Sequence, residues 1–449
     1  MVKSLPIVLL QASLRLVVAG LLLGGAIGGR AQPNLPPLPQ NLPENLPQNA
    51  GHEPLLIEQY PEKPSASPAF TIPVGALGFS APGAVYLFHR QSLVSLDFLD
   101  ENRLLFSFRA PGLMRRESGN DTDDKERQIR ALVLALPDGR IESEAKWMVP
   151  DRARYLWMLN GGHFLLRDAD GLEQGDATLK TTPLLRLPGN LLWLELDPAQ
   201  QVMITNSLEP GAAQASGENK SAATDADPAK STEQKPEPQQ TLVVRTWRRQ
   251  TGEVIHLARV PWTSQSADWP VNSDGYVESV KDVENQWVLR LNLFAGGSKI
   301  VGRVESSCLP KPAFVSETEL LVTTCDPRGG GRLVAMVTSG GGWLWNVPKA
   351  ANTMWPLLVM ALGGSRFARE TLVLKRPVTR YKRLLRADDL RGQMVRVMDA
   401  ADGKLMLEAP IRPMLDGGGN LAISPSGRRV AILNDGAIEV FELPPAKRP

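Results

Sequence analysis

The stretch NLAISPSGRRVAILNDGAIEVFELP, residues 420–444, determines the fold that we predict for this chain of 449 residues. It contains three short apolar runs, which are joined by two tight turns, Pro-Ser-Gly and Asn-Asp-Gly. Turn residues of this kind between apolar runs indicate antiparallel strands. Only three strands fit in this stretch, so a fourth strand that would complete a sheet has to come from another part of the sequence.

Similar hairpin patterns recur along the chain. Each has an apolar run, a short polar turn and a second apolar run, and they lie at residues 96–108, 155–166, 192–204, 277–289, 313–322, 357–368 and 422–432. None shows a helical period, and they repeat about every 50 residues, which is typical of the blades of a β-propeller. We therefore predict an all-β, seven-bladed β-propeller. Because the fourth pattern is weak, six or eight blades also fit.

The strand that the last blade lacks is expected before the first repeat. The run AVYLFHR, residues 84–90, precedes the first hairpin and has no blade of its own. We predict that this N-terminal strand pairs with the last blade. Closing the ring in this way protects strand edges that would otherwise pair with other chains.

The segment SPSGRRVAILNDGAIEVFEL, residues 424–443, resembles the blade pattern of the WD40-like and YVTN-type propellers, with Ser426 where that group usually has Asp. Elsewhere the resemblance is to the period and the strand rhythm, and no blade carries the Gly-His and Trp-Asp pairs of true WD40 repeats. The chain is similar to uncharacterised exported bacterial propellers, which implies a fold and a compartment but no reaction.

Residues 1–31 are predicted to be a signal peptide. Lys3 and Arg15 make the segment positive, twelve apolar residues follow at 16–27, and small residues stand near 29–31. The apolar run is shorter than the ~20 residues of a membrane span. An uncleaved anchor starting near Leu5 is the alternative. We expect an exported protein, periplasmic or extracellular, with no transmembrane span after cleavage.

Two further segments differ in composition from the repeats. Residues 32–68 hold ten prolines and are predicted to be an extended Pro-rich linker. Residues 209–240 contain no large apolar side chain and are predicted to be a disordered insertion between neighbouring strands. The propeller is accordingly assigned to residues 69–449.

Cys308 and Cys325 are the only cysteines. A hairpin turn centred between Ser316 and Glu317 would place them opposite one another, and an exported protein meets an oxidising compartment. We predict a disulfide bond that contributes about 3 kcal/mol by closing its loop. Two buried free thiols are the alternative.

The sequence contains no recognisable catalytic, cofactor or metal motif. Its formal charge of +2 disfavours nucleic-acid binding. There are four histidines, no two closer than 37 residues, and no G-x-S-x-G or phosphate-binding loop. Asp168 and Asp170, with Asp176 downstream, raise the idea of a calcium loop, but an Asp-stabilised turn fits their spacing better. We name no catalytic, cofactor or metal residue.

One strongly charged segment stands out as a candidate for partner binding. Residues 375–386 contain six cations and no acid: Lys375, Arg376, Arg380, Lys382, Arg383 and Arg386. We expect this loop to project from one rim of the ring, where it could bind an anionic partner electrostatically. A solvated loop balanced by Asp388 and Asp389 is the alternative.

The sequence therefore favours an exported, non-enzymatic propeller that binds a protein or an anionic envelope component through its loops. The alternative is a propeller enzyme, a hydrolase or oxidoreductase with a metal-dependent site at the central channel. Fold alone does not decide between these, because propellers host many functions. We expect a monomer.

Overall fold

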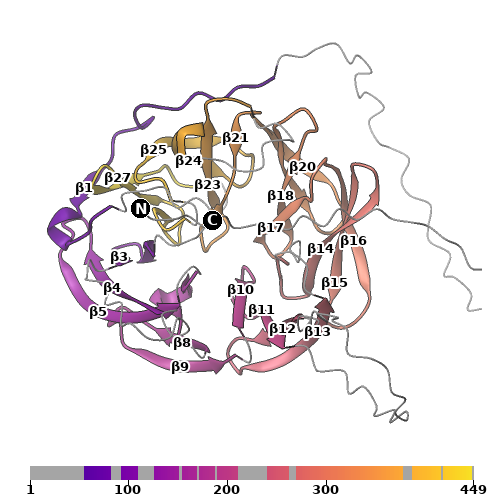
Figure 1. Cartoon of the computed structure of the whole chain (residues 1–449), viewed down its shortest axis with the longest axis horizontal. Helices are drawn as coiled ribbons and strands as arrows, with labels where there is room; N and C mark the ends of the chain where they lie inside the picture. Colours follow the sequence, from indigo (N-terminus) through magenta and orange to yellow (C-terminus); the bar gives the residue numbers. More distant parts are fainter. Residues whose placement is uncertain are drawn as a thin grey trace, which may run out of the picture. The chain divides into compact units, whose positions relative to one another are not determined.

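Seven antiparallel sheets lie around a ring in the computed structural model (Figure 1). The structure describes residues 55–81, 93–109, 126–150, 154–168, 171–187, 190–210, 240–261, 269–377, 387–415 and 418–446. The all-β, seven-bladed propeller is confirmed, and neither six nor eight blades is correct.

The first three blades have four strands each. Blade 1 contains β2 (Ser95–Asp100), β3 (Arg103–Arg109), β4 (Glu126–Ala135) and β5 (Ile141–Pro150). Blade 2 contains β6 (Leu156–Met158), β7 (Phe164–Arg167), β8 (Gly171–Gly175) and β9 (Thr181–Arg186). Blade 3 contains β10 (Asn190–Leu196), β11 (Val202–Pro210), β12 (Gln240–Arg248) and β13 (Glu253–Pro261).

The remaining four blades are more varied. Blade 4 contains β14 (Gly275–Val283), β15 (Gln286–Leu293) and β16 (Ser298–Glu305). Blade 5 contains β17 (Lys311–Ser316), β18 (Glu319–Cys325), β19 (Gly331–Val337) and β20 (Trp343–Lys349). Blade 6 contains β21 (Thr353–Met354), β22 (Leu358–Met360), β23 (Arg366–Leu374), β24 (Leu390–Asp399) and β25 (Leu405–Ile411). Blade 7 contains β26 (Leu421–Ile423), β27 (Arg429–Asn434), β28 (Ala437–Glu442) and β1 (Phe70–Pro73).

The core lies between the blades. Successive residues of a strand point to opposite faces of its sheet, so each blade can bury apolar side chains against both neighbours. Leu105 of β3 belongs to the buried cluster that contains Phe164 of blade 2, whereas the adjacent Phe106 belongs to the cluster that contains Val440 of blade 7. The strands are therefore apolar on both faces, which explains why their sequences show nearly continuous apolar runs.

The ring closes through the N-terminal side of the chain, but through a strand other than the predicted one. β1 pairs antiparallel with β28, with Phe70 opposite Val440 and Pro73 opposite Ala437. Residues 84–90, which we expected in this position, lie outside the described residues. The strand of FTIP was missed because only four residues pair, although Ile72 is buried against blades 7 and 1.

Blade 4 also differs from the expected pattern. The hairpin at 277–289 exists as β14 and β15, but these are not the two innermost strands. Residues 270–271 lie inside β14, where Val271 bridges Tyr276 and the Val277 amide donates to the Pro270 carbonyl. The first turn of this blade is therefore Asn272–Gly275. This shift explains why the fourth repeat was weak and poorly spaced.

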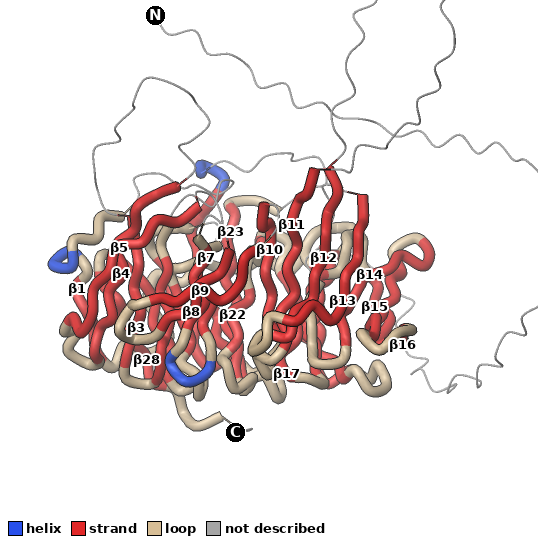
Figure 2. The backbone as a smooth tube through the Cα atoms, turned by 90° about the horizontal axis from the view of Figure 1, so that it is seen from below, coloured by secondary structure: helices blue, strands red, loops and turns tan. Residues whose placement is uncertain are grey.

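The two faces of the ring carry different connections (Figure 2). The turn face, as we call it, holds the turns between first and second and between third and fourth strands, each of two to five residues. At the loop face lie the strand ends that are joined by the connections between second and third strands and between blades, including the ends that flank 110–125, 211–239 and 375–389. Long connections are thus confined to one face.

The predicted insertion at residues 209–240, which contains no large apolar side chain, joins two neighbouring strands, as the apolar runs on either side of it suggested. β11 and β12 pair without interruption from Val202 opposite Arg248 to Pro210 opposite Gln240. The strand ends Pro210 and Gln240 lie at the loop face, and residues 211–239 between them lie outside the described residues. Within the described part of the chain, no helix has the length and apolar character needed to cross a membrane.

Candidate functional site

On the turn face, hydrogen bonds between neighbouring blades join the turns that connect the first and second strands of each blade. Gln200 in blade 3 accepts a hydrogen bond from the Asn160 amide of blade 2 at 2.6 Å. On the other side of the ring, the Ser426 amide of blade 7 donates to Glu101 of blade 1 at 2.8 Å. Because the turns are short and bonded to their neighbours, this face is a rigid base for the ring.

Glu317 connects three blades on the turn face. Its Oε1 accepts from the Ala199 amide of blade 3 at 3.1 Å, and its Oε2 accepts from the Ser273 amide of blade 4 at 2.8 Å. Asp197 lies nearby and is 1% exposed. Burial raises the pKa of Asp197 to about 6, and the negative charge of Glu317 contributes to the shift. Both carboxylates hold backbone amides and serve as structural caps.

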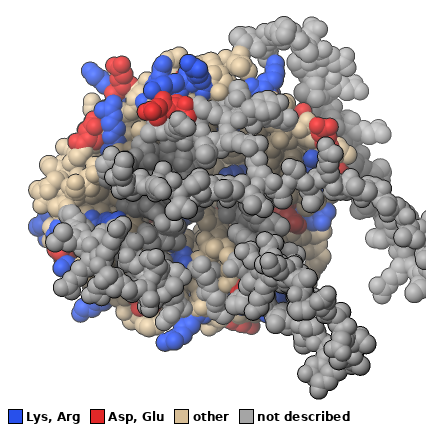
Figure 3. Space-filling view, in the orientation of Figure 1, with Lys and Arg blue, Asp and Glu red and all other residues tan. Residues whose placement is uncertain are grey.

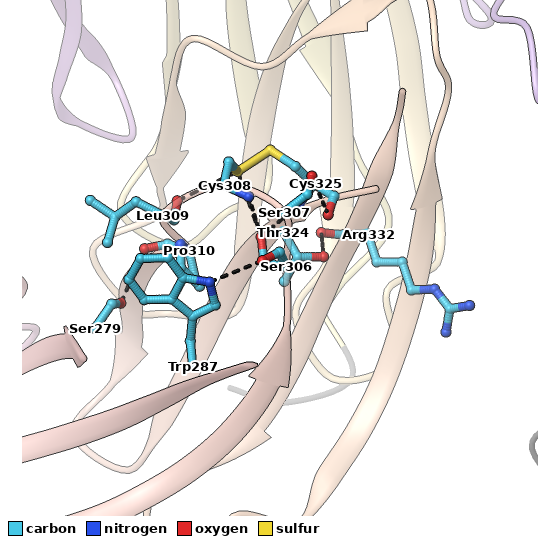
Figure 4. The surroundings of a disulfide bond; sticks show 10 residues. All are labelled: Ser279, Trp287, Ser306, Ser307, Cys308, Leu309, Pro310, Thr324, Cys325 and Arg332. Carbon is cyan, nitrogen blue, oxygen red and sulfur yellow. Dashed lines mark hydrogen bonds between the residues drawn. A yellow bond between two sulfur atoms is a disulfide. The ribbon is translucent and has the colours of Figure 1, made fainter. Parts of the chain in front are cut away.

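Cys308 and Cys325 form the predicted disulfide bond, with their Cα atoms 5.5 Å apart (Figure 4). Cys325 ends β18, and Cys308 lies in the connection that enters blade 5 at the loop face. Ser306 supports the bridge, since its Oγ accepts from the Cys325 amide at 3.0 Å. The hairpin turn lies at Glu317–Thr318, next to the predicted centre. The alternative of two free thiols is excluded.

The disulfide lies where blades 4 and 5 meet. The indole of Trp287 in β15 donates to the Ser306 carbonyl at 2.9 Å, and the Ser279 hydroxyl of β14 donates to the Pro310 carbonyl at 3.1 Å (Figure 4). The bridge thus holds the start of β17 against its partner strand, while blade 4 holds the segment from the other side. The disulfide, which we call the staple, therefore has a structural role close to the loop face.

The predicted basic loop joins β23 to β24 at the loop face. Lys375 and Arg376 are exposed, and the Lys375 amide donates to the Asp389 carbonyl at 2.9 Å. Arg380, Lys382, Arg383 and Arg386 lie outside the described residues. Figure 3 shows described basic side chains interspersed with acidic ones around the rim of this face. The site that we predicted is therefore seen only at its two flanks.

A strap that sequence analysis had assigned to the linker packs on blade 6. The Glu58 amide donates to Asn352 Oδ1 at 2.7 Å, and Asn352 Nδ2 donates back to the Glu58 carbonyl at 3.0 Å. Farther along, the Ser65 amide donates to the Glu408 carbonyl at 2.7 Å. Residues 55–68, which we call the strap, thus follow the outside of blade 6 before β1 begins. Their high proline content concealed these contacts.

Arg396 is the ionic anchor of the strap. Its Nη2 lies 2.8 Å from Glu58 Oε1, and its Nε lies 2.6 Å from Glu408 Oε2. The Arg396 guanidinium is about four-fifths buried, so its two ion pairs are partly shielded from water. Partly buried, charge-assisted hydrogen bonds of this type are stronger than surface ion pairs. Sequence reasoning had no signal for this triad, because Glu58 lies 338 residues from Arg396 in the sequence.

A small polar pocket lies between blades 2 and 3. Arg154, Trp157 and Arg167 line it together with residues 191–194. Burial lowers the pKa of Arg167 to about 10. Both arginines make further interactions within the protein, so their charges are already engaged.

The segment that raised the idea of a calcium loop is described only in part, because Asp170 lies outside the described residues. Asp168 and Asp176 lie at opposite ends of β8, and each accepts a hydrogen bond from a nearby backbone amide, from Gly171 and from Thr178. The Asp-stabilised turn is therefore the correct interpretation of Asp176. Among the described residues, no group of three or more His, Cys, Asp or Glu side chains could hold a metal ion.

No protein-family model and no curated protein matches this chain. Solved structures with similar folds include the Pyrococcus horikoshii acylaminoacyl peptidase, with 11% identity and a TM-score of 0.40. That similarity covers 72% of this chain and 53% of the peptidase, so the chain spans about half of that protein's length.

Two other similar structures are propellers. The Myceliophteria thermophila Cps50 (Swd1) β-propeller domain has 11% identity and a TM-score of 0.40, covering 86% of this chain and 100% of that one. Chaetomium thermophilum Sqt1, bound to the N-terminus of ribosomal protein L10, has 10% identity and a TM-score of 0.38, covering 81% and 100%. At this level of identity the similarity concerns the fold alone.

Proposed function

We propose that this chain is an exported, non-enzymatic β-propeller scaffold that binds a protein or an anionic envelope component through its loop face. The observation that carries the proposal is the asymmetry of the ring. One face consists of short turns bonded to one another, whereas the other carries the long connections, including the basic segment 375–386.

The charge of the basic segment supports the choice of partner. Lys375 and Arg376 are exposed where β23 ends, so cations stand at the edge of the loop face. Six cations in twelve residues attract anionic surfaces over about 8–10 Å at physiological salt. The stapled and strapped ring beneath would hold the segment on a rigid support. The enzyme alternative gains no metal-binding residue set from the described part of the chain.

The proposal is tested by crosslinking in cells and capture of the tagged full-length protein. The loop variant changes Lys375, Arg376, Arg380, Lys382, Arg383 and Arg386 to Gln. A matched variant changes six exposed cations on the turn face to Gln: Arg140, Lys180, Arg248, Lys299, Lys404 and Arg428.

We expect a partner that the wild type and the turn-face variant capture and the loop variant loses. Equal loss in both variants would assign the effect to net charge, and retention by the loop variant would contradict the role of this segment. Fractionation of the same cells tests export, because a protein confined to the cytosol would contradict that part of the proposal.

A further inference from the structure

Two cations contact one tryptophan at the boundary between blades 5 and 6, and a third lies close enough to one of them to affect its pKa. Trp355 lies between β21 and β22, where Pro356 interrupts the innermost strand of blade 6. The guanidinium carbon of Arg369 lies 3.8 Å from the centroid of the indole ring, and Lys349 Nζ lies 5.5 Å from the same centroid. Both contacts are cation–π interactions, which place positive charge against the aromatic face.

Arg369 is buried, and no carboxylate of the described residues forms an ion pair with it. It is 1% exposed, and its Nε and Nη1 have no hydrogen-bond partner among the residues that the structure describes. Burial lowers the pKa of Arg369 to about 9. A buried guanidinium is normally paired, because removing its charge from water is unfavourable. The indole contact compensates for only part of this cost.

Lys349 and Lys311 add positive charge on the side facing blade 5. Lys349 ends β20 and is half-buried, and burial lowers its pKa to about 8, with Lys311 and Arg369 as further causes. Lys311 is exposed at the start of β17, the innermost strand of blade 5. It follows Cys308 by three residues, so the disulfide staple restrains its backbone.

The two carboxylates that influence the charge of Arg369 already form ion pairs with another arginine. Arg369 and Arg396 stand opposite one another in the β23–β24 register, and Glu58 and Glu408 both bind Arg396. These two carboxylates stabilise the charge of Arg369 through space only. With Lys311, Lys349, Arg369 and Arg396 against two carboxylates, the boundary keeps an excess of positive charge.

We propose that Lys349 and Arg369, which contact Trp355, form together with Lys311 a binding site for an oxyanion, the carboxylate or phosphate group of a small ligand. An oxyanion accepts charge-assisted hydrogen bonds from ammonium groups and gives the buried guanidinium its missing counter-charge. The half-buried indole offers an apolar surface for the rest of the ligand. Exposed Lys311 on the inner strand marks the side from which the ligand enters.

The site is tested with the full-length protein, using inorganic phosphate and succinate as separate probes in titration calorimetry. We expect saturable binding of one probe, and its identity distinguishes a phosphate ligand from a carboxylate ligand. Lys349→Gln should weaken this binding at least ten-fold, and Lys311→Gln several-fold. Lys404→Gln, which removes an exposed lysine from the turn face, should leave it unchanged.

Amine labelling gives a second readout that does not require an Arg369 variant to fold. At pH 8, Lys349 should react with an acylating reagent, because burial lowers the pKa of its amine to about 8. The saturating probe should protect Lys349 and not Lys404, as measured by mass spectrometry. Absence of saturable binding for both probes, or binding that Lys349→Gln leaves unchanged, would overturn the proposal. Both results are independent of whether the loop face captures a partner.

Discussion

Individual carboxylates stabilise the turn face by accepting hydrogen bonds from backbone amides. Glu317 accepts amides from blades 3 and 4 although it belongs to blade 5, because blade 4 contributes only residues 270–271 to its innermost position. Asp197 caps the Val202 amide at 2.7 Å in the same place. Because Asp197 is buried beside the carboxylate of Glu317, its contact with the Val202 amide should depend on pH.

The pKa of Asp197 in the folded protein, about 6, is above the ordinary value of 3.8 for this side chain, so the folded state holds the proton more tightly. Protonated Asp197 therefore stabilises the folded state below pH ~4, and this contribution to the free energy of unfolding, up to about 3 kcal/mol, is lost as the pH rises through 6. In Asp197→Asn this change of the free energy of unfolding with pH should disappear, while the side-chain oxygen still accepts a hydrogen bond from the Val202 amide. Urea unfolding of both proteins between pH 4.5 and 7 measures the difference. A pH profile shared by both proteins would contradict the assignment.

At the scale of the element, the strap shows how an irregular segment becomes part of a fold. It forms no sheet of its own, yet its backbone bonds to Asn352 and Glu408, and Glu58 binds Arg396. Tyr60 lies so close to Gly392 that a Cβ there would be 2.4 Å from the ring. The strap is therefore fitted to blade 6 by side-chain contacts, which a proline count does not reveal.

Glu58→Gln should destabilise the protein by about 1–3 kcal/mol, because Arg396 would lose a bidentate carboxylate in a partly buried position. Glu62→Gln is the matched control, since Glu62 lies on the same strap and is exposed. Urea unfolding gives the free energies, and limited proteolysis of the strap gives a local readout. Equal stability of the two variants would show that the ion pair does not hold the strap.

At the scale of the whole molecule, the ring depends on joining residues about 370 positions apart in sequence. β1 covers the outer edge of β28 and places Ile72 in the cluster shared by blades 7 and 1. An uncovered β28 would present free backbone groups to other chains. Four residues of β1 therefore protect both the stability and the solubility of the ring.

Ile72→Ala should lower the free energy of unfolding by about 2–5 kcal/mol, since it removes a side chain that is 3% exposed. Thr71→Ala on the same strand should change it by less than about 0.5 kcal/mol, because Thr71 is exposed. Chemical unfolding compares the two variants. Light scattering at high concentration should also show more aggregation for Ile72→Ala, and a similar cost for both changes would contradict closure through this strand.

The sequence by itself determined the all-β class, the seven blades and the disulfide bond. These follow from local signals: turn residues between apolar runs, a period of about 50 residues, and two cysteines placed symmetrically about one hairpin. Such signals can be recognised in the sequence because backbone pairing within a hairpin depends on residues that are close together in the chain.

Tertiary structure alone decided which strand closes the ring, which strands of blade 4 lie innermost, and where the strap runs. It also brought Lys349 and Arg369 to Trp355, Lys311 close to Lys349, and Glu58 to Arg396. These contacts join residues from different blades, and their energies depend on burial and on distances across blade boundaries. Nothing in the local sequence encodes either quantity, because both arise only when the blades pack against one another.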